Sequence, residues 1–175
     1  MFRAKAKAAM VVGVAGAVVG LGYWRTHGSR GLPPGPLALP VYSSITGIAI
    51  DSKVPFTFAQ AVLWNKTNDP VVVERAALVG RPPGMQVLGV YVRVPRGLAI
   101  GPGTDMTGLS PVAGYPLAAR QAVALVFHLS VSRDGVFQAR GVRGWYRVGS
   151  THCSLILPQD VKACAPQARY LHGGC

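Results

Sequence analysis

Acidic side chains are scarce in this chain of 175 residues. Six Asp and Glu residues stand against 18 Lys and Arg residues, which gives a formal net charge of +12. General acid–base catalysis needs titratable groups placed beside one another, and so few acids leave little material for such pairs. Two of the six, Asp69 and Asp134, stand in turn sequences, where Asp bonds its own backbone. The shortage argues against an active site built on paired carboxylates.

Catalytic and cofactor motifs are also missing. Ser, His and Asp all occur, but no G-x-S-x-G elbow or comparable context assembles them. His128 alternates with apolar residues, so we expect a structural histidine with satisfied hydrogen bonds rather than a general base. Asn65-Lys66-Thr67 fits a glycosylation sequon, yet its setting in the sequence NKTNDP favours turn chemistry. The sequence therefore predicts no enzymatic activity and no cofactor.

Charged residues make up only 14% of the chain and hydrophobic residues 50%, and there are 22 glycines and 14 prolines. Gly and Pro disfavour helices, so this composition favours short strands joined by tight turns. The length beyond the N-terminal region allows one domain of ordinary size with its own core.

An apolar run without a charge, residues 8–24, follows the basic residues Arg3, Lys5 and Lys7. This arrangement predicts a single transmembrane helix near the lower length limit, with the basic segment 1–7 in the cytoplasm. Everything after the run is then extracytoplasmic. The spacing of Gly13, Gly16 and Gly20 suits a close helix contact in the membrane, although a run of Gly, Ala and Val produces such spacing by chance.

A cleaved signal peptide is the alternative interpretation of the same run. Ala15-Gly16-Ala17 offers an A-x-A cleavage site, and cleavage would give a secreted protein. An uncleaved anchor explains better why apolar residues continue to Trp24. Both interpretations export the remainder of the chain.

Beyond the run, the sequence divides into three parts. Residues 25–40, which include Pro-Pro-Gly-Pro, predict a semi-rigid stalk of extended geometry. Residues 41–165 predict a β-sandwich domain, and residues 166–175 a C-terminal tail. Residues 95–116 carry five Gly and four Pro without a period and predict a long loop.

Alternating apolar residues between turn signals predict about seven strands in residues 41–165. We expect strands at 41–50, 56–64, 71–79, 85–94, 122–132, 136–148 and 151–158. The segment 85–94 is apolar on both faces and predicts a central strand. Asp134-Gly135 predicts a hairpin turn, and Gly141 and Gly144 predict bulges in the return strand. The expected fold is an all-β, immunoglobulin-like antiparallel β-sandwich preceded by one transmembrane helix.

A resemblance supports this class. The segments FAQAVLWNKTNDPVVVERAALVG, QVLGVYV and GVRGWYRVG, between Phe56 and Val148, resemble a pattern in small exported or membrane-anchored proteins of actinobacteria. The resemblance implies an immunoglobulin-like sandwich of unknown function. It implies no functional residues.

Three cysteines, Cys153, Cys164 and Cys175, stand in the last quarter of the chain. Exported chains meet an oxidising compartment, so we expect a disulfide, with Cys153 and Cys164 as the predicted pair. Cys175 then stays free, pairs with another chain, or replaces Cys153 as the partner of Cys164. A metal site that adds His152 and His172 is disfavoured, because zinc sites usually carry tight ligand pairs and only His172 and Cys175 are close in sequence, on a Gly-rich tail.

Basic and aromatic residues gather around the segment 133–147. Arginine forks bind carboxylate and phosphate, so these residues predict a face for an anionic ligand or an acidic partner. The alternative is a solvated outer sheet face with Trp145 in the core. The candidate residues are Arg133, Arg140, Arg143, Trp145, Tyr146 and Arg147.

These features together predict a non-enzymatic, extracytoplasmic binding or assembly module. The leading hypothesis is an accessory subunit of a membrane or envelope complex, with membrane lipid around its N-terminal helix and a protein partner. The alternative is a solitary anchored or secreted module that binds anionic envelope lipid or wall polymer through the basic face. The exported location argues against nucleic acid as a partner.

Overall fold

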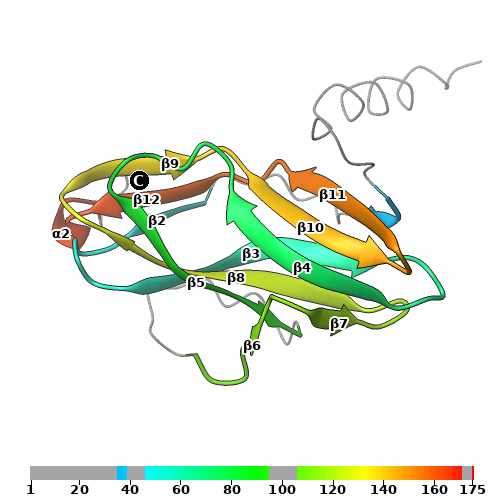
Figure 1. Cartoon of the computed structure of the whole chain (residues 1–175). Coiled ribbons are helices and arrows are strands. Elements are labelled where there is room, and N and C mark those ends of the chain that lie inside the picture. The colour runs from blue at the N-terminus through cyan, green and yellow to red at the C-terminus, as the bar shows by residue number, and fades with distance from the viewer. Residues whose placement is uncertain (1–34, 39–45, 95–105, 171–174) are drawn as a thin grey trace, which may run out of the picture.

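The computed structural model describes residues 35–38, 46–94, 106–170 and 175, and these form an all-β protein with one short helix (Figure 1). The strands are β1 (Leu37–Ala38), β2 (Thr46–Ala49), β3 (Phe56–Asn65), β4 (Val71–Leu78), β5 (Met85–Arg93), β6 (Ser110–Pro111), β7 (Tyr115–Leu117), β8 (Ala122–Val131), β9 (Gly135–Ala139), β10 (Val142–Val148), β11 (Thr151–Leu157) and β12 (Val161–Ala165). The helix is α2 (Gln167–Tyr170).

The described strands form three sheets. A five-stranded sheet has the order β1-β3-β8-β5-β6, a four-stranded sheet the order β11-β10-β4-β7, and a three-stranded sheet the order β2-β12-β9. Among these strands every pairing is antiparallel except that of β2 with β12, which is parallel. Parallel neighbours need a long connection, and here most of the domain separates β2 from β12. The all-β, antiparallel expectation is therefore confirmed except for this pair.

Strand β8 is the centre of the five-stranded sheet and of the core. Its inward residues are completely buried, as the alternation in the sequence predicts: Val123, Leu125, Phe127, Leu129 and Val131. Phe127 lies opposite Phe58 of β3 and packs in one core cluster with Tyr146 of the four-stranded sheet and Ala163 of the three-stranded sheet. Figure 1 shows β4 and β10 lying over β3 and β8, with this core between them.

Strand β5 is not central, contrary to prediction. Only the two-residue strand β6 lies beyond it, and Val87 and Leu88 are 37% and 47% exposed. The register of β5 against β8 shifts between Val87 and Gly89, so Leu88 lies at a bulge near the open edge. An apolar pattern on both sides of this strand therefore did not mean burial on both sides.

The predicted return strand 136–148 is two strands in two sheets. β9 pairs with β12, whereas β10 pairs with β4 and β11. Gly141 stands between them with a φ of +134°, and a Cβ there would lie 2.8 Å from the carbonyl oxygen of Leu157. Glycine permits this close approach where the chain changes sheet. Gly144 is not a bulge, because the register shift on β10 falls between Trp145 and Tyr146.

The turns are placed as predicted, but most join different sheets. Asp134-Gly135 follows β8, and the next strand, β9, lies in another sheet, so the predicted hairpin is wrong. Gly149-Ser150 joins β10 to β11, which pair directly from Val148 and Thr151. Turn chemistry in the sequence thus marks where the chain reverses but not which strands pair.

Part of the predicted long loop is structured. β6 and the first two residues of β7 lie within 95–116, and Val112 there is buried, as is Leu117 directly after it. β7 pairs with β4, so this stretch closes the edge of the four-stranded sheet. Residues 95–105 lie outside the described part of the chain.

Most of the predicted N-terminal organisation also lies outside the described residues. This applies to the segment 1–7, the transmembrane helix 8–24, its contact residues Gly13, Gly16 and Gly20, and residues 25–34 of the stalk. Within the described residues, no helix is both long and apolar enough to cross a membrane. Leu37 and Ala38, assigned to the stalk, instead form β1 against Asn65 and Trp64.

Candidate binding face

Three of the predicted residues share one face of β10. Arg143, Trp145 and Arg147 alternate along the strand with buried Val142, Gly144 and Tyr146. Because successive side chains in a strand point to opposite sides, the first three lie on the outer face of the four-stranded sheet. The alternative that Trp145 belongs to the core is wrong, because its half-buried ring lies on this outer face.

A bulge in β4 adds two charged residues to the same face. Val73 pairs with Tyr146 and Arg75 with Trp145, which leaves Glu74 as the extra residue on β4. The extra residue interrupts the alternation, so Glu74 and Arg75 both contact outward side chains of β10.

Two guanidinium groups contact the ring of Trp145. Cζ of Arg75 lies 4.0 Å from the centroid of the Trp145 ring, and Cζ of Arg143 lies 5.7 Å from it. A guanidinium over an aromatic face is a favourable cation–π arrangement. Nε of Arg143 is buried and has no hydrogen-bond partner. Both cations thus contact one ring, and neither forms an ion pair with a carboxylate among the described residues.

Glu74 turns away from these two arginines. Its carboxylate lies 2.9 Å from Nδ1 of His152 and 4.0 Å from Nε of Arg147. Nη1 of Arg147 also donates a hydrogen bond to the carbonyl oxygen of Gly149 at 2.5 Å. Exposed ion pairs of this kind contribute at most about 1 kcal/mol to stability, so their main effect is to fix the orientation of these side chains.

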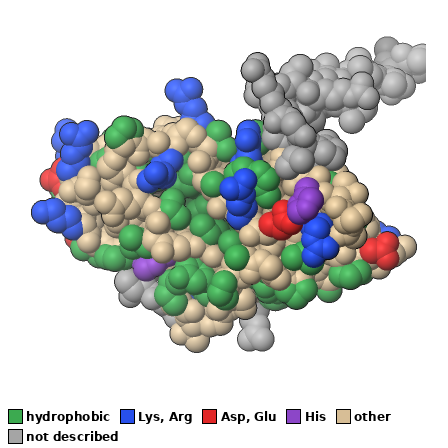
Figure 2. All heavy atoms as spheres, viewed as in Figure 1, with side chains coloured by type: hydrophobic (Ala, Val, Ile, Leu, Met, Phe, Trp, Pro, Cys, Tyr) green, Lys and Arg blue, Asp and Glu red, His purple; other side chains and the backbone are tan. Residues whose placement is uncertain are grey.

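We name this surface the Arg–Trp face; its residues are Glu74, Arg75, Arg143, Trp145, Arg147 and His152. Figure 2 shows basic side chains gathered with an acidic side chain and a histidine over β10. Three arginines stand against one glutamate, so the face is cationic. The sequence had not assigned Glu74, Arg75 or His152 to this face. Two adjacent charged residues inside the apolar run of β4 were the available signal for a bulge.

Tyr146 does not belong to this face. It is 1% exposed and points into the core, where its hydroxyl oxygen accepts a hydrogen bond from the backbone N–H of Leu37 at 3.3 Å. Burial raises the pKa of Tyr146 to about 12. The hydrogen bond from Leu37 lowers the pKa, but its effect is smaller than that of burial. The prediction failed because residues 145 and 146 are neighbours in sequence and therefore point to opposite faces of the strand.

Arg133 and Arg140 lie elsewhere in the fold. Arg133 is exposed in the turn between β8 and β9, and Figure 1 places this turn at the opposite end of the molecule from the turn between β10 and β11. Arg140 is exposed between β9 and β10, and its backbone N–H donates to the carbonyl oxygen of Val79 at 2.8 Å. Neither has a contact with the Arg–Trp face among the described interactions.

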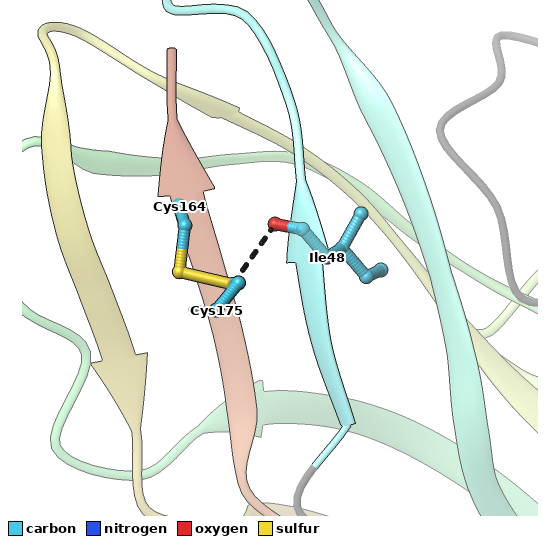
Figure 3. The surroundings of a disulfide bond; sticks show 3 residues. All are labelled: Ile48, Cys164 and Cys175. Carbon is cyan, nitrogen blue, oxygen red and sulfur yellow. Dashed lines mark hydrogen bonds between the residues drawn. A yellow bond between two sulfur atoms is a disulfide. The ribbon is translucent and has the colours of Figure 1, made fainter. Parts of the chain in front are cut away.

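The disulfide joins Cys164 to Cys175, so the predicted Cys153–Cys164 pairing is wrong. The open alternative, with Cys175 in place of Cys153, is the one present. Figure 3 shows the bond extending from β12 toward β2, where the sulfur of Cys175 lies 3.4 Å from the carbonyl oxygen of Ile48. A Cβ at Gly47 would lie 2.5 Å from the carbonyl carbon of Cys175, so this glycine permits the close approach of the C-terminal residue.

Cys153 is a free thiol buried on β11. It belongs to the four-stranded sheet, whereas Cys164 belongs to the three-stranded sheet, which is why proximity in sequence did not make them partners. Burial raises the pKa of the Cys153 thiol, which keeps it protonated and unreactive at neutral pH.

The remaining candidates for chemistry have structural settings. Asp51 accepts a hydrogen bond from the backbone N–H of Gln167, and Asp160 accepts one from the side chain of Gln138. In the described part of the chain no cluster of His, Cys, Asp and Glu could hold a metal ion; His172 lies outside that part. His128 differs from expectation, because its Nε2 is buried without a hydrogen-bond partner.

The comparisons with known proteins identify no family. No family model and no curated protein sequence matches the chain. Among the solved structures that resemble it are the ASH / PapD-like domain 7 of human CEP192 and the VesB protease of Vibrio cholerae. The CEP192 domain is 10% identical with a TM-score of 0.42, over 77% of this chain and 88% of that one. VesB is 8% identical with a TM-score of 0.41, over 75% and 32%. Neither likeness is close enough to carry a functional argument.

Proposed function

We propose that this chain is a non-enzymatic binding module that docks on a partner protein through the Arg–Trp face. The observation that carries the proposal is the placement of Arg75 and Arg143 over one tryptophan ring without an acidic partner in the described structure. Both groups are positively charged and contact the same ring, so each attracts an incoming anion. Arg and Trp are also the residues that most often dominate protein interfaces.

A protein partner fits this face better than a membrane or a wall polymer. Recognition of anionic lipid surfaces uses clusters of about four to eight basic residues. The Arg–Trp face has three arginines, and Glu74 on the same face lies near one of them, Arg147. Trp145 is covered by Arg75, so the ring is not free to enter a lipid interface or to stack on a sugar.

The proposal includes the placement predicted from the sequence. The module is anchored by residues 8–24 and presented outside the cytoplasm as an accessory subunit of a membrane or envelope complex. The immunoglobulin-like assignment also belongs here; it is supported by two antiparallel sheets that share one core, with the mixed β2-β12-β9 sheet as a departure.

The test compares matched variants of the tagged full-length protein, purified from its native host in mild detergent. Arg75→Gln removes one cation from the Arg–Trp face, and Arg133→Gln makes the same change at an exposed arginine outside it. A stoichiometric partner should copurify with wild type and Arg133→Gln. With Arg75→Gln its recovery should fall roughly tenfold, which corresponds to 1.4 kcal/mol.

Hydrogen exchange should locate the contact. We expect partner-dependent protection of β4 and β10 and none in the turn between β8 and β9. A partner recovered equally with both variants would place docking elsewhere. A monomeric protein without a partner would contradict the proposal, and salt-sensitive retention on anionic vesicles or wall fragments would instead support the solitary binding module.

A further inference from the structure

The Arg–Trp face also has a geometry that identifies the group it receives. We infer that a single carboxylate, from an Asp or Glu side chain of the partner, binds between Arg75 and Arg143. This inference rests on the proposed function and specifies the chemistry of the same face.

The hydrogen-bond donors of Arg75 are available to a ligand. Its Cζ lies 4.0 Å from the Trp145 centroid, which is a distance for contact through the flat side of the guanidinium group. The five N–H donors lie in the plane of that group, so stacking leaves them at its edge, available to an acceptor. The ring thus limits the motion of the guanidinium group while its hydrogen-bonding capacity stays free.

Arg143 is a second cation at the same ring without an acidic partner among the described residues. Its Cζ lies 5.7 Å from the same ring centroid, and its Nε is buried without a partner. A buried donor of a charged group that makes no hydrogen bond carries a desolvation cost. Neither Arg75 nor Arg143 has an acidic partner within the described ranges of the chain. An anion beside both guanidinium groups would offset their positive charges through their accessible N–H groups, whereas the buried Nε of Arg143 is out of its reach.

Glu74 makes the Arg–Trp face better suited to a carboxylate than to a phosphate polymer. Glu74 lies on the same face and is fixed by His152 at 2.9 Å. Its negative charge opposes a chain of closely spaced phosphates more strongly than it opposes one carboxylate. A carboxylate also matches a guanidinium fork with two parallel hydrogen bonds. The inference therefore commits to an acidic protein side chain.

The experiment uses the full-length protein in detergent and two blocked peptides, acetyl-Gly-Glu-Gly-amide and acetyl-Gly-Gln-Gly-amide. NMR follows the indole N–H of Trp145 and the Nε–H signals of Arg75 and Arg143 during titration. The Glu peptide should give saturable shifts with a dissociation constant in the millimolar range. The Gln peptide should bind at least tenfold more weakly.

Three variants separate geometry from charge. Arg75→Lys keeps the cation but loses the planar fork, and Trp145→Leu keeps both cations but removes their platform. Each should weaken binding of the Glu peptide at least fivefold. Arg133→Lys, the matched control, should leave binding unchanged. Arg75 is exposed, so Arg75→Lys remains informative even if Trp145→Leu unfolds.

Several outcomes would overturn the inference. These are equal binding of the Glu and Gln peptides, no effect of Arg75→Lys, no shifts at all, or tighter binding of inorganic phosphate or of vesicles rich in anionic lipid. Its failure is distinguishable from failure of the proposed function. A copurifying partner that is lost with Arg75→Gln would still establish docking by this face, even if no carboxylate binds there.

Discussion

At the scale of single residues, Asn65 shows how one polar side chain organises a turn. The residue is 0% exposed, and its Nδ2 donates to the carbonyl oxygens of Asp69 at 2.8 Å, Ala118 at 3.0 Å and Leu117 at 3.3 Å. Its Oδ1 accepts hydrogen bonds from the N–H and the hydroxyl of Thr67. A glycan on Nδ2 would require this buried atom to be exposed. Turn chemistry at the sequon is therefore confirmed.

Tyr146 supplies a pH-dependent prediction at the same scale. Burial raises its pKa to about 12, whereas an exposed tyrosine has a pKa of about 10. The unfolded chain therefore loses this proton at lower pH than the folded chain, and the free energy of unfolding falls as pH rises from 10 to 12. The loss from this group should be about 2 kcal/mol by pH 12. Denaturant unfolding of wild type and Tyr146→Phe measures it.

Tyr146→Phe should be about 1 kcal/mol less stable than wild type at pH 7, because the Leu37 hydrogen bond is lost. This difference should shrink above pH 10, since only wild type can ionise at this position. At pH 7 Tyr146 is protonated in both the folded and the unfolded chain, so the measurement at this pH is the control. A stability difference that stays constant to pH 12 would contradict the assigned burial.

At the scale of elements, the C-terminal segment is held by residues that are distant in sequence. Cys175 is bonded to Cys164 of β12 and lies against Gly47 of β2, which pairs with β12 in parallel. Local periodicity marks β12 only weakly, and the sequence assigned Cys164 to the wrong partner. Which strand lies beside another depends on contacts that the local pattern does not contain.

The disulfide gives the prediction at this scale. It closes a loop with a sequence separation of 11, and a cross-link of that length stabilises by about 2–3 kcal/mol. Cys175→Ser should lose this amount in oxidising buffer and should not respond to reductant. Denaturant unfolding with and without dithiothreitol provides the measurement.

Cys153→Ser is the matched control for the disulfide. Because the buried Cys153 thiol is free, this variant should keep the same sensitivity to reductant as wild type, whatever its own stability. If Cys153→Ser abolishes that sensitivity while Cys175→Ser retains it, the pairing described here is wrong.

At the scale of the whole molecule, one core connects all three sheets. Phe127 of the five-stranded sheet, Leu117 of the four-stranded sheet and Ala163 of the three-stranded sheet belong to the same buried cluster. Most turns carry the chain from one sheet to another, so strands that are consecutive in the chain seldom pair. Each sheet is therefore assembled from strands that the other sheets separate in the sequence. We therefore expect the domain to unfold in one cooperative transition.

Leu117→Ala tests this expectation at the end of β7, directly after the predicted loop 95–116. Leu117 is 0% exposed, so its truncation should cost about 2–5 kcal/mol, whereas Pro116→Ala at the exposed neighbouring position should cost far less. Tryptophan fluorescence and far-UV circular dichroism should report coincident transitions for both variants. Separate transitions, or a loss below 1 kcal/mol for Leu117→Ala, would contradict the single core.

The sequence by itself determined the class of structure and much of its local detail. Alternation along β8 identified its inward residues. The same period of two applies to β10, but the predicted face included Tyr146, which the structure directs inward. Gly149-Ser150 is typical of a turn, because glycine adopts the positive φ that the turn contains; the structure shows that this turn joins paired strands. These features depend on residues close together in the chain, so their signal is local.

Tertiary structure alone decided the rest. It divided 136–148 between two sheets, brought Arg75 of β4 onto Trp145 of β10, and placed Cys175 beside Cys164. The physical reason is that alternation specifies which side of a strand is buried but carries no information on the neighbouring strand. That choice is made by packing among residues far apart in sequence, and the Arg–Trp face exists only once β4 and β10 have paired.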